Sequence, residues 1–149
     1  DPNSFSKGIG IEEWKRLNAD KKAPLLNKSI AGQYPPGSTF KMLVGLAALE
    51  AGIIKTWSSV YCPGHFTLGS HTFNCWKEGG HGTVDFHQAV AQSCDTFFYT
   101  VADRMGIDKY AKMARRFGLG QRYDIGLMGE KSGIIPDPEW KMKSYKQRW

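Results

Sequence analysis

Ser38 and Lys41 are the two residues whose types and spacing most directly suggest chemistry. They lie three positions apart in the segment GSTFK, and residues at positions i and i+3 of a helix project from the same face. A serine hydroxyl is a weak nucleophile unless a base stands beside it, and a lysine amine can act as that base when it is neutral. The spacing therefore predicts a nucleophile and a general base within hydrogen-bond reach of each other.

A second pair, Ser93 and Asp95 in the segment SCD, strengthens this interpretation. The S-x-x-K spacing alone also fits a serine that caps a helix and a lysine that faces solvent. The second pair follows 55 residues after Ser38, in a break between two helix patterns. S-x-x-K followed by S-x-N or S-x-D is typical of penicillin-recognising serine acyltransferases. The two motifs together favour acyl transfer.

Three cysteines and a histidine form another set of chemically capable residues. They follow the pattern C-x12-C-x5-H-x12-C, at Cys62, Cys75, His81 and Cys94. This is the donor set of a Cys3His zinc site, but the pattern lacks the short C-x2-C spacing that marks such sites. Spacing alone favours a Cys62–Cys75 disulfide with Cys94 free, or plain buried thiols.

The elements that must position these residues follow from hydrophobic periodicity and turn signals. Two prolines and a glycine precede the strongest helix pattern, the apolar run 40–49. Gly52 follows this run and is the expected C-terminal stop of the helix. The alternation in 65–76 predicts a hairpin that turns near Gly69-Ser70. Further helices are predicted at 11–20, 86–93, 96–106 and 108–118, and the stretch 119–138 is predicted to be loop with one short strand. Phe97, Phe98 and Tyr99 are predicted to pack in the core. Core packing is also favoured for Trp76, with the alternative that this residue, which precedes Lys77, lines the cleft.

The composition is that of a globular protein and excludes two other classes. The chain has 149 residues, of which 41% are hydrophobic and 23% charged. Its net charge of +6 is spread along the chain without a recognised binding motif, so we expect no nucleic-acid partner. No apolar run approaches the roughly 18 residues of a membrane span.

Several segments resemble the transpeptidase domain of the class B penicillin-binding proteins, and among them the elongation-specific penicillin-binding protein 2 family. The most specific features are the block YPPGSTFK and the use of S-x-D. The resemblance covers essentially the whole chain. Its segments are NKSIAGQYPPGSTFKMLVGLAALEAGII, CWKEGGHGTVDFHQAVAQSCDTFFYTVADRMGID, FGLG with DIGL, and SGIIPDPEWK.

The resemblance implies a fold that is mainly α with a small β-hairpin. This is the helical portion of the α/β, serine β-lactamase-like transpeptidase fold, with the central sheet largely outside the chain. The chain is then expected to be the N-terminal part of that domain. We divide it into a leading segment (1–34), a nucleophile helix (35–52), a hairpin region (53–83), and a helical subdomain with a truncated tail (84–149).

The resemblance also implies a peptidoglycan D,D-transpeptidase that needs no cofactor for catalysis. Ser38 would attack the penultimate D-alanine of a stem peptide, and Lys41 would be its general base. Ser93 would relay a proton to the leaving amine, and Asp95 would orient the site and bind a substrate amide. β-Lactam antibiotics would acylate Ser38. The full-length parent would also bind a SEDS-type glycosyltransferase and scaffold proteins, on the periplasmic side of the bacterial inner membrane, with its anchor outside this chain.

The same resemblance favours a structural zinc. Some penicillin-binding proteins 2 place metal-binding side chains at the positions of Cys62, Cys75, His81 and Cys94. The ion would tie the hairpin to the loop that carries the SCD motif, without performing chemistry. His65, His71 and His87 are assigned no role.

The third family motif, K-T-G or K-S-G on a strand, has a match at Lys131-Ser132-Gly133 that we do not assign to it. The segment shows no strand pattern and follows Asp95 by only 36 residues. The true strand is expected outside the chain, so the fragment is expected to be inactive alone. Two alternatives remain open: a serine β-lactamase or β-lactam sensor, and a non-catalytic, zinc-tied interaction module.

Overall fold

The structure, a computed structural model, describes residues 2–149; Asp1, the first residue of the expected leading segment, lies outside them. The chain divides into two compact units. The first contains Asp1–Tyr34 and Arg122–Ser132, and the second contains Pro35–Gln121 and Gly133–Trp149.

The first unit contains little regular structure. Its elements are the 3-10 turn η1 (Pro2–Phe5), α1 (Ile11–Ala19) and the single-turn helix α2 (Lys28–Ala31). The first of the predicted helices is confirmed by α1. Sequence periodicity missed α2 because four residues are too few to show a helical repeat. The backbone N–H of Lys131 donates to the carbonyl of Ile30, which joins the two segments of this unit.

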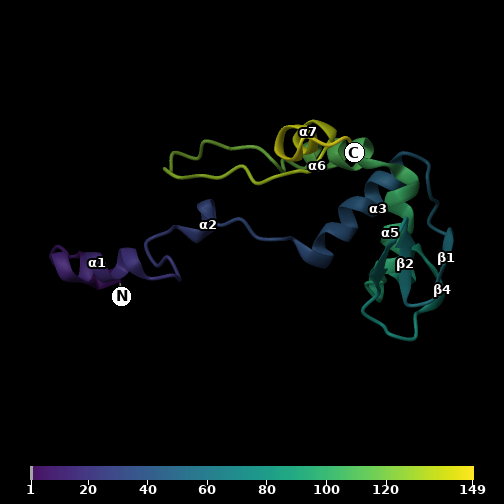
Figure 1. The fold of residues 1–149 in the computed structure, drawn as a ribbon, viewed down its shortest axis with the longest axis horizontal. Helices are drawn as coiled ribbons and strands as arrows, with labels where there is room; N and C mark the ends of the chain where they lie inside the picture. Colours follow the sequence, from purple (N-terminus) through teal and green to yellow (C-terminus); the bar gives the residue numbers. More distant parts are fainter. Residues whose placement is uncertain (1) are drawn as a thin grey trace. The chain divides into compact units, whose positions relative to one another are not determined.

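The second unit contains most of the regular structure and is dominated by helices (Figure 1). The prediction of a mainly helical fold with a small β-hairpin is confirmed. Its elements in chain order are η2 (Gly37–Thr39), α3 (Phe40–Glu50), β1 (Ser59–Cys62), β2 (His65–Leu68), β3 (His71–Asn74), β4 (Gly82–Asp85), α4 (Phe86–Ala91), α5 (Asp95–Met105), α6 (Ile107–Arg116) and α7 (Pro138–Tyr145).

The strands form two antiparallel pairs. The hairpin β2–β3 turns through Gly69-Ser70, with Leu68 opposite His71, as the sequence predicted. The pair β1–β4 was not predicted; it aligns Cys62 with Gly82. Its two strands are four residues long and have the whole hairpin between them, so no local turn signal announces their pairing.

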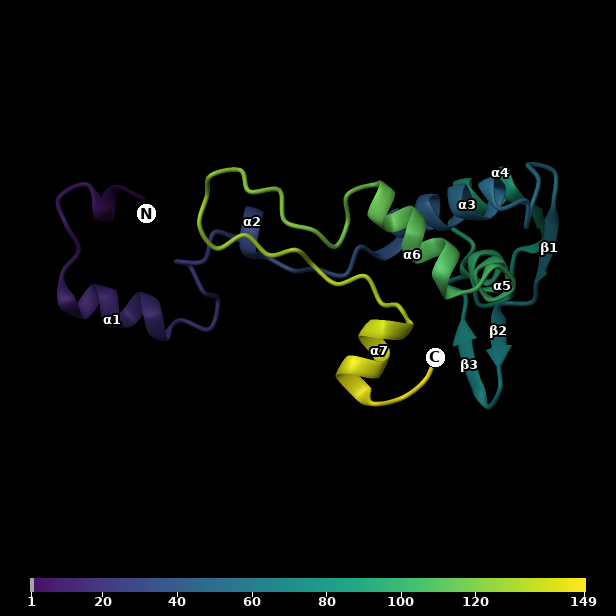
Figure 2. The ribbon, with the colours of Figure 1, turned by 90° about the horizontal axis from the view of Figure 1, so that it is seen from above.

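The core lies around α5, which contacts α3, α6, β1 and β2. Figure 2 shows the hairpin β2–β3 beside this helix. Phe97, Val101 and Met105, spaced by four residues, are buried on one face. Phe98 is also buried, as predicted, but Tyr99 is 36% exposed, so its prediction as a core residue is wrong. Its ring lies instead against the hairpin residues Phe66 and Phe73.

The helix α3, which follows the turn that carries Ser38, is held in the core by its apolar side. Leu43, Val44, Ala47 and Ala48 are buried. Gly45 lies under the ring of Phe86, and an added Cβ would come within 2.6 Å of that ring. This close approach seats α4 against α3.

The C-terminal part differs from the prediction in two ways. Residues 119–138 contain no strand, although one was predicted there. The helix α7 follows, and sequence periodicity did not indicate it because its apolar residues form no stripe. Asp137 caps it by accepting a hydrogen bond from the Trp140 N–H, and Pro138 occupies its first turn. An Asp-Pro start is a helix signal that the sequence does contain. Among the described residues, no helix has the length and apolar character needed to cross a bilayer.

Candidate active site and metal-binding cluster

Four polar residues from the two sequence motifs meet beside the start of α3. Ser38 lies in the 3-10 turn η2, and Lys41 lies in the first turn of α3. Ser93 is in the loop between α4 and α5, and Asp95 is the first residue of α5. The structure thus brings together all four residues that the sequence nominated as a reactive site.

Lys41 is the centre of this network. Its Nζ donates to the hydroxyl of Ser93 (2.9 Å), to the carbonyl of Ser93 (2.9 Å) and to Oδ1 of Asp95 (2.5 Å). These three acceptors match the three N–H donors of an ammonium group. The side chains of Lys41 and Asp95 are 16% and 20% exposed, so solvent screens their attraction only in part.

Ser38 joins the network through Ser93. The Ser93 hydroxyl donates to Oγ of Ser38 at 2.9 Å. The direct Ser38–Lys41 hydrogen bond expected from their spacing is absent among residues 2–149. Ser38 lies in the 3-10 turn η2 before α3 begins, and its hydroxyl meets Ser93, while the Lys41 amine is taken up by Ser93 and Asp95. Ser38 is solvent-exposed, so a ligand can reach its hydroxyl.

The backbone at Ser93 adopts a left-handed conformation, with a φ of 51°. For a residue with a side chain, this region costs about 1–2 kcal/mol. The conformation presents both the hydroxyl and the carbonyl of Ser93 to the same lysine ammonium. Strained residues of this kind concentrate at functional sites.

Asp95 is held as a carboxylate between two donors. Burial alone would raise its pKa, but the hydrogen bond from Lys41 and that from the backbone N–H of Trp76 outweigh burial and lower the pKa below its ordinary value. The Trp76 N–H reaches Oδ2 at 3.0 Å while Lys41 holds Oδ1. Asp95 therefore stays ionised at neutral pH.

Trp76 does not pack in the core, so that prediction is wrong. It is 65% exposed, and its indole N–H donates to the carbonyl of Gln92 at 2.9 Å. Its ring meets the His81 ring edge-to-face, with centroids 5.3 Å apart. An indole N–H needs an acceptor, and the loop carbonyl of Gln92 supplies one at the surface. In the sequence, Trp76 stands between Cys75, a member of the predicted zinc set, and Lys77. This position is the signal that could have indicated a place near the site and not in the core.

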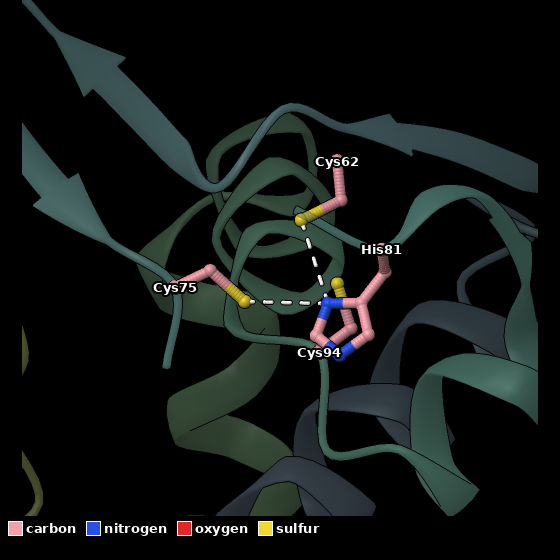
Figure 3. A group of neighbouring side chains, drawn as sticks. All are labelled: Cys62, Cys75, His81 and Cys94. Atoms are coloured by element: carbon pink, nitrogen blue, oxygen red, sulfur yellow. Dashed lines mark hydrogen bonds between the residues drawn. The ribbon is translucent and has the colours of Figure 1, made fainter. Parts of the chain in front are cut away.

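Cys62, Cys75, His81 and Cys94 converge on one point (Figure 3). Their ligand atoms all lie within 4.8 Å of one another. Nδ1 of His81 is 3.6 Å from the Cys62 sulfur and 3.5 Å from the Cys75 sulfur. The cysteines are buried free thiols, so the predicted alternative of a Cys62–Cys75 disulfide is wrong. These four residues, the Cys/His cluster, could hold a metal ion.

Two glycines allow the chain to bring His81 to this cluster. Gly80 has a φ of 75°, and a Cβ there would lie 2.2 Å from the carbonyl oxygen of Cys62. Gly64 has a φ of 101°, and its Cβ would lie 2.6 Å from the carbonyl oxygen of Glu78. Only glycine combines this left-handed backbone with such close approach.

The thiols of the cluster differ in their tendency to ionise. For Cys62, burial opposes the thiolate, but Thr96 and the backbone and side chain of His81 stabilise it and lower its pKa to about 6. For Cys94, burial disfavours the thiolate and raises the pKa to about 12, and the neighbouring cysteines add to this effect. A cluster with one easily ionised thiol has a starting point for cation binding, since metal ligation requires thiolates.

The cluster and the serine-lysine network are continuous along the chain. Cys94 lies between Ser93 and Asp95, and Cys75 directly precedes Trp76. Any group that fixes the cluster therefore fixes the backbone that presents Ser93, Asp95 and the Trp76 N–H.

The segment Lys131-Ser132-Gly133 forms no strand. This agrees with the expectation that it is not the third family motif, which lies on a strand.

Comparisons with known proteins identify the family. Residues 1–148 match the penicillin binding protein transpeptidase domain. The peptidoglycan D,D-transpeptidase MrdA of Acinetobacter baumannii is 41% identical over 99% of this chain and 22% of its own length. The chain thus spans less than a quarter of the length of this curated relative.

Solved structures of related proteins support the same family assignment. Pseudomonas aeruginosa PBP2 in complex with WCK 5153 is 39% identical, with a TM-score of 0.90 over 100% of this chain and 33% of that one. PBP2 of Helicobacter pylori in complex with MreC is 37% identical, with a TM-score of 0.90 over 99% of this chain and 28% of that one. This chain therefore belongs to the penicillin-binding protein transpeptidase domain family.

Proposed function

We propose that this chain is the nucleophile-bearing part of a peptidoglycan D,D-transpeptidase, which cross-links stem peptides through a serine acyl-enzyme and releases D-alanine. The observation that carries the proposal is the hydrogen-bonded chain from Ser38 through Ser93 to Lys41 and Asp95. It links an exposed hydroxyl to an amine and a carboxylate, as acyl transfer requires. The relatives named as D,D-transpeptidases support the same reaction.

In the proposed reaction, Oγ of Ser38 attacks the carbonyl carbon of the penultimate D-alanine. The C–N bond to the terminal D-alanine breaks, the departing amine takes a proton, and an ester remains on Ser38. An amine of a second stem peptide then attacks this ester, which forms the cross-link and restores the serine hydroxyl. A β-lactam would acylate the same hydroxyl and remain on it.

We propose a part in moving the proton for each neighbour of Ser38, and the hydrogen bonds support it. Lys41, whose Nζ lies within hydrogen-bond distance of Ser93 and Asp95, would accept the proton as the general base. The Ser93 hydroxyl bonds both Ser38 and Lys41, and is thus the path for the proton that leaves Ser38. Asp95 holds the lysine in place and is a positioning residue.

The environment of the enzyme belongs to the same proposal. We assign it to the periplasmic side of the inner membrane, with the anchor outside this chain, and expect a scaffold partner and a SEDS-type glycosyltransferase. The complex of the Helicobacter pylori protein with MreC supports the scaffold partner. Within the domain, we keep residues 1–34 as the leading segment, 35–52 as the nucleophile helix, 53–83 as the hairpin region and 84–149 as the helical subdomain with its tail.

The Cys/His cluster is proposed to hold a structural zinc. Zinc bonds of about 2.3 Å to sulfur and about 2.0 Å to nitrogen, in a tetrahedron, separate those atoms by about 3.5 Å. The distances from His81 Nδ1 to the sulfurs of Cys62 and Cys75 are 3.6 and 3.5 Å, which fit the sulfur–nitrogen separation expected around a tetrahedral zinc. The ion would supply only a cross-link between the hairpin region and the loop that presents Ser93 and Asp95.

Elemental analysis of the purified full-length protein tests the zinc. We expect about one zinc per chain, and a chelator should lower the melting temperature by about 5 °C or more, since bound metal stabilises only the folded state. His81→Ala should lose the zinc, and His71→Ala, at an exposed hairpin position, should retain it. A metal-free protein, or a Cys62–Cys75 disulfide detected by mass spectrometry, would contradict the proposal.

Release of D-alanine tests the reaction itself. Incubated with a pentapeptide stem ending in D-Ala-D-Ala and an acceptor amine, the full-length protein should release D-alanine in step with the cross-linked product. Penicillin should block both. If penicillin labels the protein but neither product forms, the protein is a β-lactam sensor. If penicillin is hydrolysed with turnover, it is a β-lactamase, and if nothing labels, it is a non-catalytic module.

A further inference from the structure

A cleft lies directly beside the serine-lysine network. It has a volume of about 410 Å³ and is lined by Trp76, Lys77, His81, Ala91, Gln92 and Ser93; we call it the Trp76 cleft. Ser93 belongs to both the cleft and the network, since its hydroxyl bonds the nucleophile Ser38 at 2.9 Å. A group attached to the ligand that acylates Ser38 therefore has this cleft within reach.

Trp76 provides a rigid aromatic wall. Its backbone N–H is held by Asp95 and its indole N–H by the carbonyl of Gln92, and its ring forms a T-shaped contact with the ring of His81. The side chain is nevertheless 65% exposed. An aromatic ring whose donors are satisfied and whose position is fixed loses little conformational entropy when a ligand packs on it. This wall is suited to a flat apolar group.

Lys77 provides the charge. Its side chain is exposed and has no hydrogen-bond or ion-pair partner among residues 2–149. None of the residues that line the cleft is acidic. Lys41, the other ammonium close by, is fully engaged by Ser93 and Asp95. The cleft thus combines one uncommitted positive charge with one aromatic face.

We propose that the Trp76 cleft is a specificity subsite for the acyl donor. It takes a donor side group that joins an apolar, planar part to a carboxylate, with the planar part on Trp76 and the carboxylate toward Lys77. This inference rests on the proposed acylation of Ser38, because the subsite is defined by its distance from that residue. Lys77 and Trp76 select among donors, and they take no part in proton transfer.

Benzylpenicillin and carbenicillin provide a matched pair of probes, because they differ by one carboxylate on the side chain. The second-order rate constant of acylation is measured for each with the full-length protein, and the carbenicillin to benzylpenicillin ratio is compared between variants. Lys77→Gln should lower this ratio about fivefold, the size of one partly exposed ion pair, and Lys77→Arg should restore it. Lys55→Gln, at an exposed position outside the cleft, should leave it unchanged.

Trp76→Ala tests the aromatic wall. It should lower the acylation rate of both penicillins about tenfold, the size of one lost aromatic contact, and Trp76→Phe should recover most of that loss. Circular dichroism checks that both variants fold. If the wild-type protein is not acylated by either penicillin, the proposed function fails. If it is acylated but Lys77→Gln leaves the ratio unchanged, the proposed function stands and the subsite is excluded.

Discussion

Replacing Ser38 with alanine is expected to abolish covalent labelling of the full-length protein by a fluorescent penicillin. In the proposed reaction the acyl-enzyme ester forms on the exposed Oγ of Ser38, whereas Ser93, the other serine of the network, is less exposed. The loss should exceed about 10⁴-fold, since a serine nucleophile and its base act as a unit. Labelled protein on a denaturing gel gives the measurement.

Ser70→Ala is the matched control. Ser70 is exposed in the turn of the β2–β3 hairpin, so its loss should change neither labelling nor folding. Ser38 is also exposed and buries no apolar surface, so Ser38→Ala should keep the melting temperature of the wild-type protein. Labelling that survives Ser38→Ala in a folded protein would place the nucleophile elsewhere and overturn the proposed reaction.

The second large effect is expected at Lys41. Lys41→Met removes the proposed base and keeps a side chain of similar length, and it should slow penicillin acylation at least 10³-fold, within the usual range for a lost general base. It also leaves the carboxylate of Asp95 without its charged partner in a site that is only 20% exposed, so a lower melting temperature should accompany the slower reaction. Lys112→Met, at an exposed position of α6, should change neither quantity.

A double variant distinguishes a base from a merely structural lysine. Ser93→Ala interrupts the path between Ser38 and Lys41. If the proton leaves through this path, Lys41→Met with Ser93→Ala should react about as slowly as Lys41→Met alone, because both changes remove the same step. Independent effects that multiply in the double variant would show that Lys41 does not act through Ser93.

The sequence alone determined the residue sets and most of the helices. The motifs S-x-x-K and S-x-D are defined by residue type and spacing, both of which the sequence shows. Ser38, Lys41, Ser93 and Asp95 could therefore be predicted from the sequence. The four longest helices were also predicted, because the repeat of apolar residues, the glycine stops and the capping residues are local signals. The donor set of the Cys/His cluster was visible in the same way.

Only the tertiary structure decided how these residues meet. The pairing of β1 with β4, the left-handed turn at Ser93, the bridge from Ser38 through Ser93 to Lys41, and the choice of a cluster over a disulfide all depend on contacts between distant segments. Trp76 was assigned to the core because its apolar surface is visible in the sequence. The acceptor that holds its indole N–H at the surface, the carbonyl of Gln92, is reached only when the chain folds, and no local pattern encodes that contact.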